Sequence, residues 1–394
     1  MKPLAITDYT LVTALGAGRN ATRAALRAGR SGLAQRGFET ATAIETWLGI
    51  VDTVDEITLA PALAAFECRN NRLAELGLRA DGFGDAVRAA AARWGATRVG
   101  VFIGTSTSGI LQTEIAYRHR DAAGALPATL DYDHTHNTYS AARYVREALG
   151  LRGPAQVVST ACSSSAKVFA TAQRMIDAGL VDAAVVGGVD SLCLTTLYGF
   201  RSLELLSDEV CRPWDAARKG LSLGEAAAYA LLEREPKRVA GWLLGAGESS
   251  DGYHMSSPHP EGAGAVAAIE AALGQAGLAS DRVDYLNLHG TGTPGNDAAE
   301  DRAVTTVFGR TLPCSSTKGS TGHTLGAAGA VEAAICLIAL EAGEAPAGIN
   351  VITPDPALHA NYLREPLRRP LEVAASNSFG FGGSNACLIF GAAR

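Results

Sequence analysis

The chain has 394 residues, of which 47% are hydrophobic and 19% are charged, and its formal net charge is −6. This composition is typical of a globular protein with a large core, built as two domains or as one duplicated domain, and it excludes a disordered chain. Because the charge is modestly acidic and no basic patch stands out, we do not expect nucleic acid as a partner.

The seven cysteines are an odd and scattered set without a CxxC pair, which argues against a disulfide framework and against a zinc site. The first residues, MKPLA, lack the long apolar run and the cleavage site of a signal peptide, and we identify no stretch long enough to span a membrane. We therefore expect a cytoplasmic protein, where reducing conditions keep thiols free.

In the first part of the chain, apolar and β-branched runs predict buried strands, and helical patterns separate them. A strand is also expected at the start of the segment VVSTACSSS, which continues as a helix to about residue 178. The other expected strands are residues 5–13, 98–104, 183–189 and 226–232, and the expected helices are residues 20–28, 85–93 and 138–149.

The second part repeats this order of elements. Alternating strands and helices predict a parallel or mixed sheet covered by helices on both faces. We infer a duplicated α/β unit with a seam near residues 235–239, which gives an N-terminal half of residues 1–238 and a C-terminal half of residues 239–394. The strands expected here are residues 239–245, 284–289, 313–317, 373–377 and 386–390, and the helices are residues 264–276, 297–307 and 325–341.

Cys162 lies where the strand of VVSTACSSS gives way to the helix. The positive end of a helix dipole stabilises a thiolate, typically by about 0.3–1 kcal/mol. We expect the small neighbouring residues to leave room for a substrate at the sulfur. By itself, a cysteine at this position also fits a purely packing role.

Three further segments place reactive and small residues after predicted strands. LNLHGTGTP contains His289, STKGSTGHTLGAAG contains Lys318 and His323, and NSFGFGGSN contains Phe381. The carboxyl ends of core strands are where open α/β sheets bind ligands, so we expect these segments to converge with Cys162. Each segment taken alone also fits a tight turn.

The residues 290–295, GTGTPG, match the GxGxxG pattern of dinucleotide-binding proteins. The helix that follows opens with Asp297, Glu300 and Asp301, which would place anions where a pyrophosphate has to sit. No acidic residue ends the next expected strand to hold a ribose hydroxyl. We therefore reject dinucleotide binding.

Cys162, His289 and His323 together supply a thiol nucleophile and two imidazoles, a set suited to acyl transfer through a thioester. Two backbone N–H groups would hold the oxyanion, and the histidines would stabilise an enolate on a second substrate. Nothing in the sequence predicts a metal or a bound organic cofactor.

The set TACSSS, HGTGTP, STKGSTGHTLGAAG with Glu332, and NSFGFGGSN resembles the β-ketoacyl-acyl-carrier-protein synthases of the elongating Cys-His-His type, which belong to the thiolase-fold superfamily. The four motifs occur in order, and the resemblance covers essentially the whole chain. It implies a five-layered αβαβα fold from two similar halves. It also implies a homodimer, with a heterodimer with a related synthase-like chain as the alternative.

The resemblance implies a decarboxylative condensation. Cys162 would accept the growing acyl chain from the phosphopantetheine of an acyl carrier protein. Malonyl carrier would then lose CO2, with the enolate stabilised by His289 and His323, and would attack the thioester to give a β-ketoacyl product. Lys318 would orient His323, and Glu332 would support this network.

The resemblance also implies roles around these residues. Backbone N–H groups of Cys162 and Phe381 would form the oxyanion hole, and the Phe381 ring would gate the passage between the acyl pocket and the malonyl site. Thr291 and Thr293 would hydrogen-bond the pantetheine arm.

Two departures from the family pattern bear on the substrate. Leu221, in Lys219-Gly220-Leu221, replaces a larger residue near the expected malonyl pocket, and Thr107 stands where a larger apolar residue can close the acyl tunnel. We hypothesise that Thr107 leaves a deeper or more polar acyl pocket. TACSSS is also more similar to polyketide-type synthases, so fatty-acid, polyketide and polyene assembly all remain open.

Two other functions fit the sequence less well. A biosynthetic thiolase needs a second cysteine in its C-terminal Gly-rich loop, whereas this chain has Ser384-Asn385 there and Cys387 in a predicted strand. A non-catalytic chain-length partner would have lost the nucleophile, whereas Cys162 and both histidines are retained.

Overall fold

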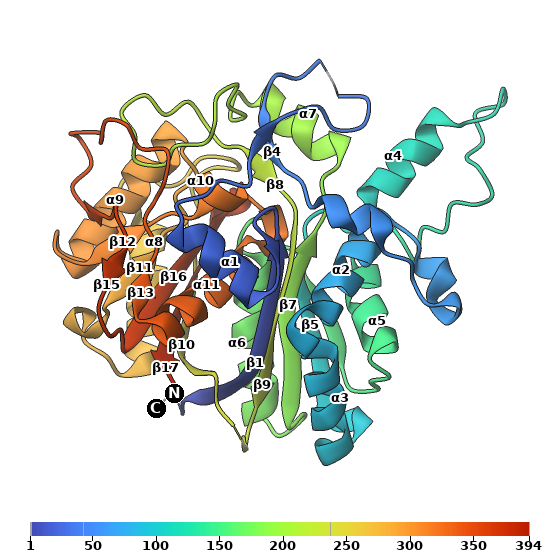
Figure 1. Cartoon of the computed structure of the whole chain (residues 1–394), viewed down its shortest axis with the longest axis horizontal. Helices are drawn as coiled ribbons and strands as arrows, with labels where there is room; N and C mark the ends of the chain where they lie inside the picture. The colour runs from blue at the N-terminus through green and yellow to red at the C-terminus, as the bar shows by residue number, and fades with distance from the viewer. Residues whose placement is uncertain (1, 42, 237, 394) are drawn as a thin grey trace.

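The computed structural model describes residues 2–41, 43–236 and 238–393. One mixed sheet of 12 strands runs through the molecule (Figure 1). The N-terminal half contributes, side by side, β1 (Leu4–Thr13), β9 (Ala226–Glu233), β7 (Ala183–Asp190), β5 (Val99–Gly104) and β6 (Ala155–Val158). In this half β9 is antiparallel to β1 and β7, whereas β7, β5 and β6 are parallel.

The C-terminal half repeats this order and these directions, with an antiparallel strand next to a parallel set. Its strands, in the same spatial order, are β10 (Gly241–Ser250), β17 (Ser384–Ala392), β16 (Val373–Gly380), β11 (Tyr285–Asn287) and β12 (Pro313–Ser315). The repeat agrees with a duplicated unit. Antiparallel pairing of β1 with β10 joins the halves. The division at 238/239 stays a prediction, and residue 237 of its seam lies outside the described residues.

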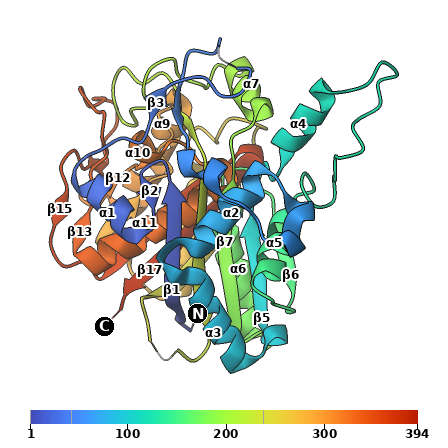
Figure 2. The same ribbon diagram turned by 45° about the vertical axis from the view of Figure 1, so that its right-hand side comes forward.

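Helices form the other layers (Figures 1 and 2). α6 (Ser164–Asp177) and α11 (Ala328–Ala342) contact each other and strands of both halves, so they form the middle layer. α2 (Arg69–Arg79), α3 (Phe83–Trp94) and α5 (Tyr139–Ala148) cover the first half, whereas α8 (Ala263–Ala276) and α9 (Pro294–Phe308) cover the second. The protein therefore has the predicted αβαβα fold.

The two middle helices approach each other very closely at their N-terminal ends. A Cβ on Gly329 would lie 2.6 Å from the backbone nitrogen of Ala166, so only glycine fits there. The Ala330 N–H also donates a 2.9 Å hydrogen bond to Ser165 Oγ. This contact fixes the first turn of α11 against the first turn of α6.

The strands and helices expected from the sequence are present, with ends shifted by a few residues. The helices α2, α4 (Ile110–Arg118), α7 (Leu194–Ser202) and α10 (Lys318–Thr321) were not predicted. In α2, the poor helix formers Asn70 and Asn71 are fully buried, and their side chains bond Ser191 N–H and Phe66 O. Tertiary contacts thus override a weak local propensity. α4 and the chain after it extend away from the body in both views (Figures 1 and 2).

The remaining elements are short or peripheral. The helices are α1 (Arg19–Arg27), α4 (Ile110–Arg118), α7 (Leu194–Ser202) and α10 (Lys318–Thr321). The strands are β2 (Gly16–Ala17), β3 (Ala34–Gln35), β4 (Trp47–Gly49), β8 (Leu223–Gly224), β13 (Glu344–Ala345), β14 (Asn361–Tyr362) and β15 (Leu367–Arg368). The 3-10 turns are η1 (Asp52–Glu56), η2 (Pro61–Phe66), η3 (Ala80–Gly82), η4 (Ala96–Arg98), η5 (Ser280–Arg282), η6 (Leu325–Ala327) and η7 (Phe381–Gly383).

One segment corrects the expectation that no stretch has the length of a membrane span. Residues Leu325–Ala342, which comprise η6 and α11, have a mean hydropathy of 1.8 over 18 residues. Within the described part of the chain this segment is 89% buried. Its apolarity is accounted for by its place in the middle layer, where strands of both halves pack on it.

We predict that Gly329→Ala destabilises the protein by about 1–3 kcal/mol, because the added methyl group has to separate the first turns of α6 and α11. Urea unfolding measures this loss. Gly274→Ala in α8 is the matched control, since its Cβ would meet nothing within 4 Å. The control should be neutral or slightly stabilising. Equal stability of the two variants would contradict the close packing described here.

Candidate active site

Cys162 lies in the turn between β6 and α6. The turn holds Ala161 at a φ of 51°, a left-handed conformation that alanine rarely adopts. Two serines close it: Ser163 Oγ donates to Thr160 O at 2.9 Å, and Ser164 Oγ accepts from the Thr160 N–H at 2.9 Å. Besides being small, these residues hold the turn that presents the sulfur through their hydroxyls. The expectation that they leave room for a substrate stays a prediction.

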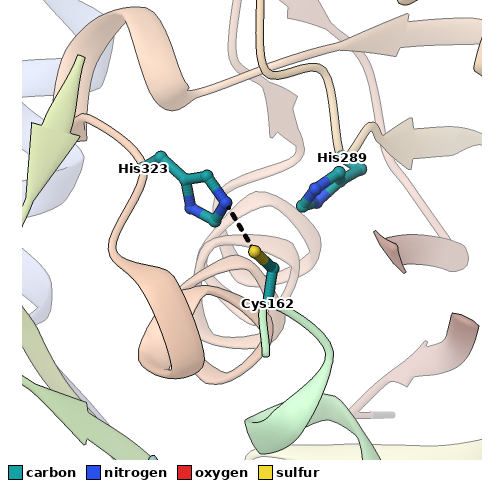
Figure 3. A group of neighbouring side chains, drawn as sticks. All are labelled: Cys162, His289 and His323. Atoms are coloured by element: carbon teal, nitrogen blue, oxygen red, sulfur yellow. Dashed lines mark hydrogen bonds between the residues drawn. The ribbon is translucent and has the colours of Figure 1, made fainter. Parts of the chain in front are cut away.

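His323 touches this sulfur, with its Nε2 2.9 Å from Cys162 Sγ (Figure 3). The other ring nitrogen, Nδ1, accepts a 3.2 Å hydrogen bond from the Leu325 N–H. A nitrogen that accepts carries no proton, so in the neutral ring the proton is on Nε2. His323 thus donates to the sulfur and is not placed to accept the thiol proton.

His289 faces the same point from the other side (Figure 3). It follows β11, and its ring centroid is 5.4 Å from that of His323, with the two rings nearly perpendicular at 86°. One ligand atom from each of Cys162, His289 and His323 lies within 4.8 Å of the others. The predicted convergence of the three residues is therefore present in the structure.

Lys318 and Glu332 form a buried ion pair beside the histidines. The Lys318 ammonium also donates to the backbone oxygen of His289 at 2.5 Å and lies 3.4 Å from His289 Nδ1. Lys318 was expected to orient His323, but in the structure its contacts are with His289. With a cation at Nδ1, the His289 proton belongs on Nε2, as in His323.

Burial lowers the pKa of both imidazoles well below the ordinary 6.5, and the Lys318 cation lowers it further. Both rings are therefore neutral near pH 7, each with a proton on Nε2. Burial also raises the pKa of the Cys162 thiol to about 12, although Lys318 and a hydrogen bond from the Phe381 N–H oppose this. At this pKa the resting Cys162 side chain is the neutral thiol, although it lies at a helix N-terminus.

A cavity of about 410 Å³ contains Cys162 and both histidines. Thr291 and Thr293 line it, with their hydroxyl oxygens 2.8 Å apart. The Phe381 ring also lines it and packs against Phe200 of α7, with 5.5 Å between ring centroids. The residues predicted for the pantetheine arm and for the gate thus lie in the same cavity as the nucleophile.

Thr107 does not line this cavity. Its hydroxyl donates to Asp190 Oδ1 at 2.9 Å, and the residue is buried. The hypothesis that Thr107 enlarges or polarises the acyl pocket is therefore not supported by the structure of this chain. Leu221 does line the cavity, as expected from its place in the sequence.

The GxGxxG segment is closed to a pyrophosphate. Glu300 accepts hydrogen bonds from the N–H groups of His289 and Gly290 at 2.8 and 2.7 Å, and Asp297 accepts one from Gly292 at 3.2 Å. Burial raises the pKa of Glu300 to about 7 and that of Asp297 to about 6. These carboxylates occupy the donors that a phosphate would need, so they shape the loop after β11 instead.

Two groups of residues have donor atoms that suit a metal. Cys162 with the two histidines offers soft ligands to an ion such as zinc. Among the other buried oxygens, Asn287 Oδ1, Glu332 Oε2 and Ser376 Oγ have no hydrogen-bond partner, and Asn287 and Ser376 pair in register on β11 and β16. Such oxygens suit a hard cation. The expectation of a protein without metal or organic cofactor stays a prediction.

The other six cysteines and the histidines His254 and His259 do not line the cavity that contains the sulfur. All seven cysteines are free and buried, and of these Cys162 alone lines the cavity. His259 packs edge-on against Tyr253 with 5.2 Å between ring centroids, and Tyr253 is 56% exposed at the cavity's rim. His254 is exposed. Neither His254 nor His259 lines the cavity.

Comparison with known families gives matches over most of the chain. The family model described as "Beta-ketoacyl synthase, N-terminal domain" matches residues 82–238, and that described as "Beta-ketoacyl synthase, C-terminal domain" matches residues 240–352. Nodulation protein E of Rhizobium meliloti is 37% identical over 75% of this chain and 76% of its own length. The 3-oxoacyl-[acyl-carrier-protein] synthase 2 of Vibrio cholerae is 34% identical over the same shares.

A mitochondrial 3-oxoacyl-[acyl-carrier-protein] synthase of Arabidopsis thaliana is 40% identical over 64% of this chain, and the match covers 59% of its length. Among solved structures, a chain in the complex of a ketosynthase with its chain length factor from Xenorhabdus doucetiae superposes with a TM-score of 0.91. It is 38% identical, and the superposition covers 99% of this chain and 98% of that one.

The buried histidines predict a pH dependence of stability. Below pH 6.5 the unfolded chain protonates imidazoles that the folded protein keeps neutral, so the free energy of unfolding falls as the pH falls. His289→Gln removes one such group. Between pH 6 and 5 we expect the wild type to lose about 1.4 kcal/mol more than this variant does.

Urea unfolding at pH 7, 6 and 5 measures this difference. His254→Gln is the matched control, because that imidazole is exposed in the folded protein. Its stability should follow that of the wild type across this range. If the wild type and His289→Gln lost the same free energy on acidification, His289 would not be a neutral buried group.

Proposed function

The chain belongs to the β-ketoacyl synthase family, and we propose that its Cys162, His289 and His323 carry out the condensation typical of that family. It is a β-ketoacyl-[acyl-carrier-protein] synthase, which joins a cysteine-bound acyl group to a malonyl group with loss of CO2. The observation that carries the assignment of residues is the 2.9 Å contact between Cys162 Sγ and His323 Nε2 inside the cavity.

In the first step, the Cys162 sulfur attacks the carbonyl carbon of an acyl thioester. A bond forms between the sulfur and the acyl carbon, the pantetheine C–S bond breaks, and the thiol proton leaves with the pantetheine sulfur. Because burial raises the pKa of the Cys162 thiol to about 12, the thiolate forms only as attack proceeds. The Nε2–H of His323 stabilises the developing charge on the sulfur.

The oxyanion of this step needs two donors near the sulfur. The Phe381 N–H already hydrogen-bonds the sulfur, and the Cys162 N–H lies in the turn before α6. We assign the oxyanion hole to these two N–H groups. Loss of one such donor typically costs about 2.7–4 kcal/mol of transition-state stabilisation.

In the second step, the malonyl thioester accepts hydrogen bonds at its carbonyl oxygen from the Nε2–H groups of His289 and His323. Breaking the bond to the carboxylate releases CO2 and leaves the electron pair on the adjacent carbon as an enolate, which the two donors stabilise. That carbon attacks the acyl group on Cys162, the C–S bond breaks, and the cysteine sulfur leaves as a thiolate, which takes a proton from water to restore the thiol. Neutral imidazoles with fixed protons suit this role because they stabilise charge without giving up a proton.

The substrates are carried on the phosphopantetheine of an acyl carrier protein, which has to enter the cavity. We assign Thr291 and Thr293, which line the cavity, to hydrogen bonds with the pantetheine of an acyl carrier protein. Assembly with a related chain is supported by the complex of a ketosynthase with its chain length factor, which has the same fold. A homodimer is the alternative, and the free, buried cysteines suit the cytoplasm.

The two other functions, a non-catalytic chain-length partner and a thiolase, are not supported by the geometry of the site. A non-catalytic chain-length partner would not need the contact between Cys162 and His323. A thiolase needs a second cysteine at the site, whereas Cys387 is buried in β17 and does not line the cavity.

We place the enzyme in the assembly of specialised polyketide or polyene chains. The support is its 38% identity to the Xenorhabdus doucetiae complex and its 26% identity to a structure named the ishigamide ketosynthase/chain length factor. Leu221 in the cavity wall leaves more room than a phenylalanine would.

We predict that Cys162→Ala abolishes condensation and acyl loading while the protein stays folded. Mass spectrometry of the intact protein after incubation with acyl carriers should show the acyl mass on the wild type and not on the variant. Cys68→Ala, at a buried cysteine outside the cavity, is the control and should load normally. Condensation by purified Cys162→Ala would refute the assignment.

The specialised pathway predicts a substrate preference. With saturated and polyunsaturated acyl carriers of equal length, we expect turnover to favour the polyunsaturated chain by about tenfold, the discrimination that a shaped pocket can supply. Competition between the two carriers for one enzyme sample, read by mass spectrometry of the products, measures this ratio. A clear preference for saturated chains would place the enzyme in primary fatty-acid synthesis.

A further inference from the structure

Asp190 is a buried carboxylate at the end of β7 that the reaction scheme above does not use. Its side chain is 0% exposed. Oδ1 accepts hydrogen bonds from the Thr105 hydroxyl at 2.5 Å and from the N–H and hydroxyl of Thr107 at 3.0 and 2.9 Å. Oδ2 accepts from the Ser106 hydroxyl at 2.6 Å and from the Gly326 N–H at 2.6 Å. A carboxylate with donors on both oxygens fixes two loops against each other.

One of these loops contains η6, which follows His323 of the active site by one residue. Gly326 lies in η6, next to Leu325, whose φ is 54° and whose N–H donates to His323 Nδ1. A non-glycine residue in this left-handed conformation is strained and needs surrounding contacts to hold it. The bond from Gly326 to Asp190 is such a contact, since it adjoins the peptide that fixes the tautomer of His323.

The packing leaves this turn little freedom to find another arrangement. A Cβ on Gly326 would lie 2.6 Å from Asp190 Oδ2 and 2.6 Å from the backbone nitrogen of Ser106. The Asp190 carboxylate and the loop 105–107 thus pack directly against the backbone of Gly326. Loss of a charged acceptor at this point removes the strongest kind of hydrogen bond available to the turn.

We propose that Asp190 is a positioning residue for the condensation: through the Gly326 N–H it holds η6, and thereby keeps His323 turned with Nε2–H toward the Cys162 sulfur. This inference rests on the proposed function only in assigning His323 to the reaction. Asp190 touches neither Cys162 nor His323, so it acts through the turn.

Asp190 also acts on the sulfur by charge, with the opposite sign. The ionisable groups around Cys162 are Lys318, which lowers the thiol pKa, Asp190 and Glu332, which raise it, and the two neutral imidazoles. Removing the Asp190 charge therefore favours the thiolate, whereas releasing His323 disfavours it. These opposite signs let one experiment separate the two effects.

The experiment measures the rate at which iodoacetamide alkylates Cys162, read by peptide mass spectrometry at pH 8. It compares the wild type, Asp190→Asn, His323→Ala and the double variant. We expect Asp190→Asn to slow alkylation about tenfold, the effect of losing one charge-assisted hydrogen bond. In the His323→Ala background the same substitution should leave the rate unchanged or raise it, because only the charge effect remains.

Two outcomes would overturn the proposal. If Asp190→Asn slowed alkylation equally in both backgrounds, Asp190 would merely support the fold. If it did not slow alkylation in the wild-type background, the turn would not depend on it. Ser106→Ala, which removes one donor from the loop but keeps the Gly326 bond, is the matched control and should stay within about twofold of the wild type.

Asp190→Glu covers the case in which Asp190→Asn does not fold, since it keeps the charge but its longer side chain displaces η6. We expect Asp190→Glu to slow alkylation of Cys162 in the wild-type background and not in the His323→Ala background. Equal slowing in both backgrounds would again refute the proposal. Alkylation needs no acyl carrier. A failure of condensation in the wild type would therefore refute the proposed function without touching this result.

Discussion

The contact between the first turns of α6 and α11 is the constraint on which the site depends. Because Gly329 has no side chain, the two helices meet at backbone distance, and Ser165 and Ala330 fix their register with a hydrogen bond. Cys162 lies just before α6, and His323 lies just before η6 and α11. Joining the helix starts therefore joins a nucleophile from one half of the chain to an imidazole from the other.

Burial then determines what these groups can do. Burial lowers the pKa of both histidines and raises that of the thiol, so these three groups are neutral at rest beside the paired Lys318 and Glu332. A buried ion pair contributes little net stability, but it fixes geometry at His289. The site is thus built to donate hydrogen bonds to a charge that develops during reaction, and it holds no charge at the sulfur beforehand.

The sequence was most informative where strands end. The positions of Cys162, His289 and His323 after their strands, with glycines and small residues around them, were enough to predict that they converge, because parallel strands deliver their carboxyl ends to one edge. The sequence was least informative about which residues each side chain contacts. Lys318 contacts His289 and not His323, and the serines after Cys162 bond the turn and α11. The role of Asp190 was not predicted, because a single aspartate at the end of a strand has no distinguishing spacing.

Local patterns by themselves determined the order of the main strands and helices, the duplication and the candidates Cys162, His289 and His323, because periodicity and turn chemistry act over a few neighbours. Only the tertiary structure decided the direction of each proton, the protonation of the thiol and the place of Thr107 outside the cavity. Those properties come from the folded backbone after His323, from contacts such as Lys318 with His289 and Thr107 with Asp190, and from exclusion of water. The sequence pattern does not encode them. The sequence therefore identifies Cys162, His289 and His323 as reactive residues, whereas the fold determines their protonation.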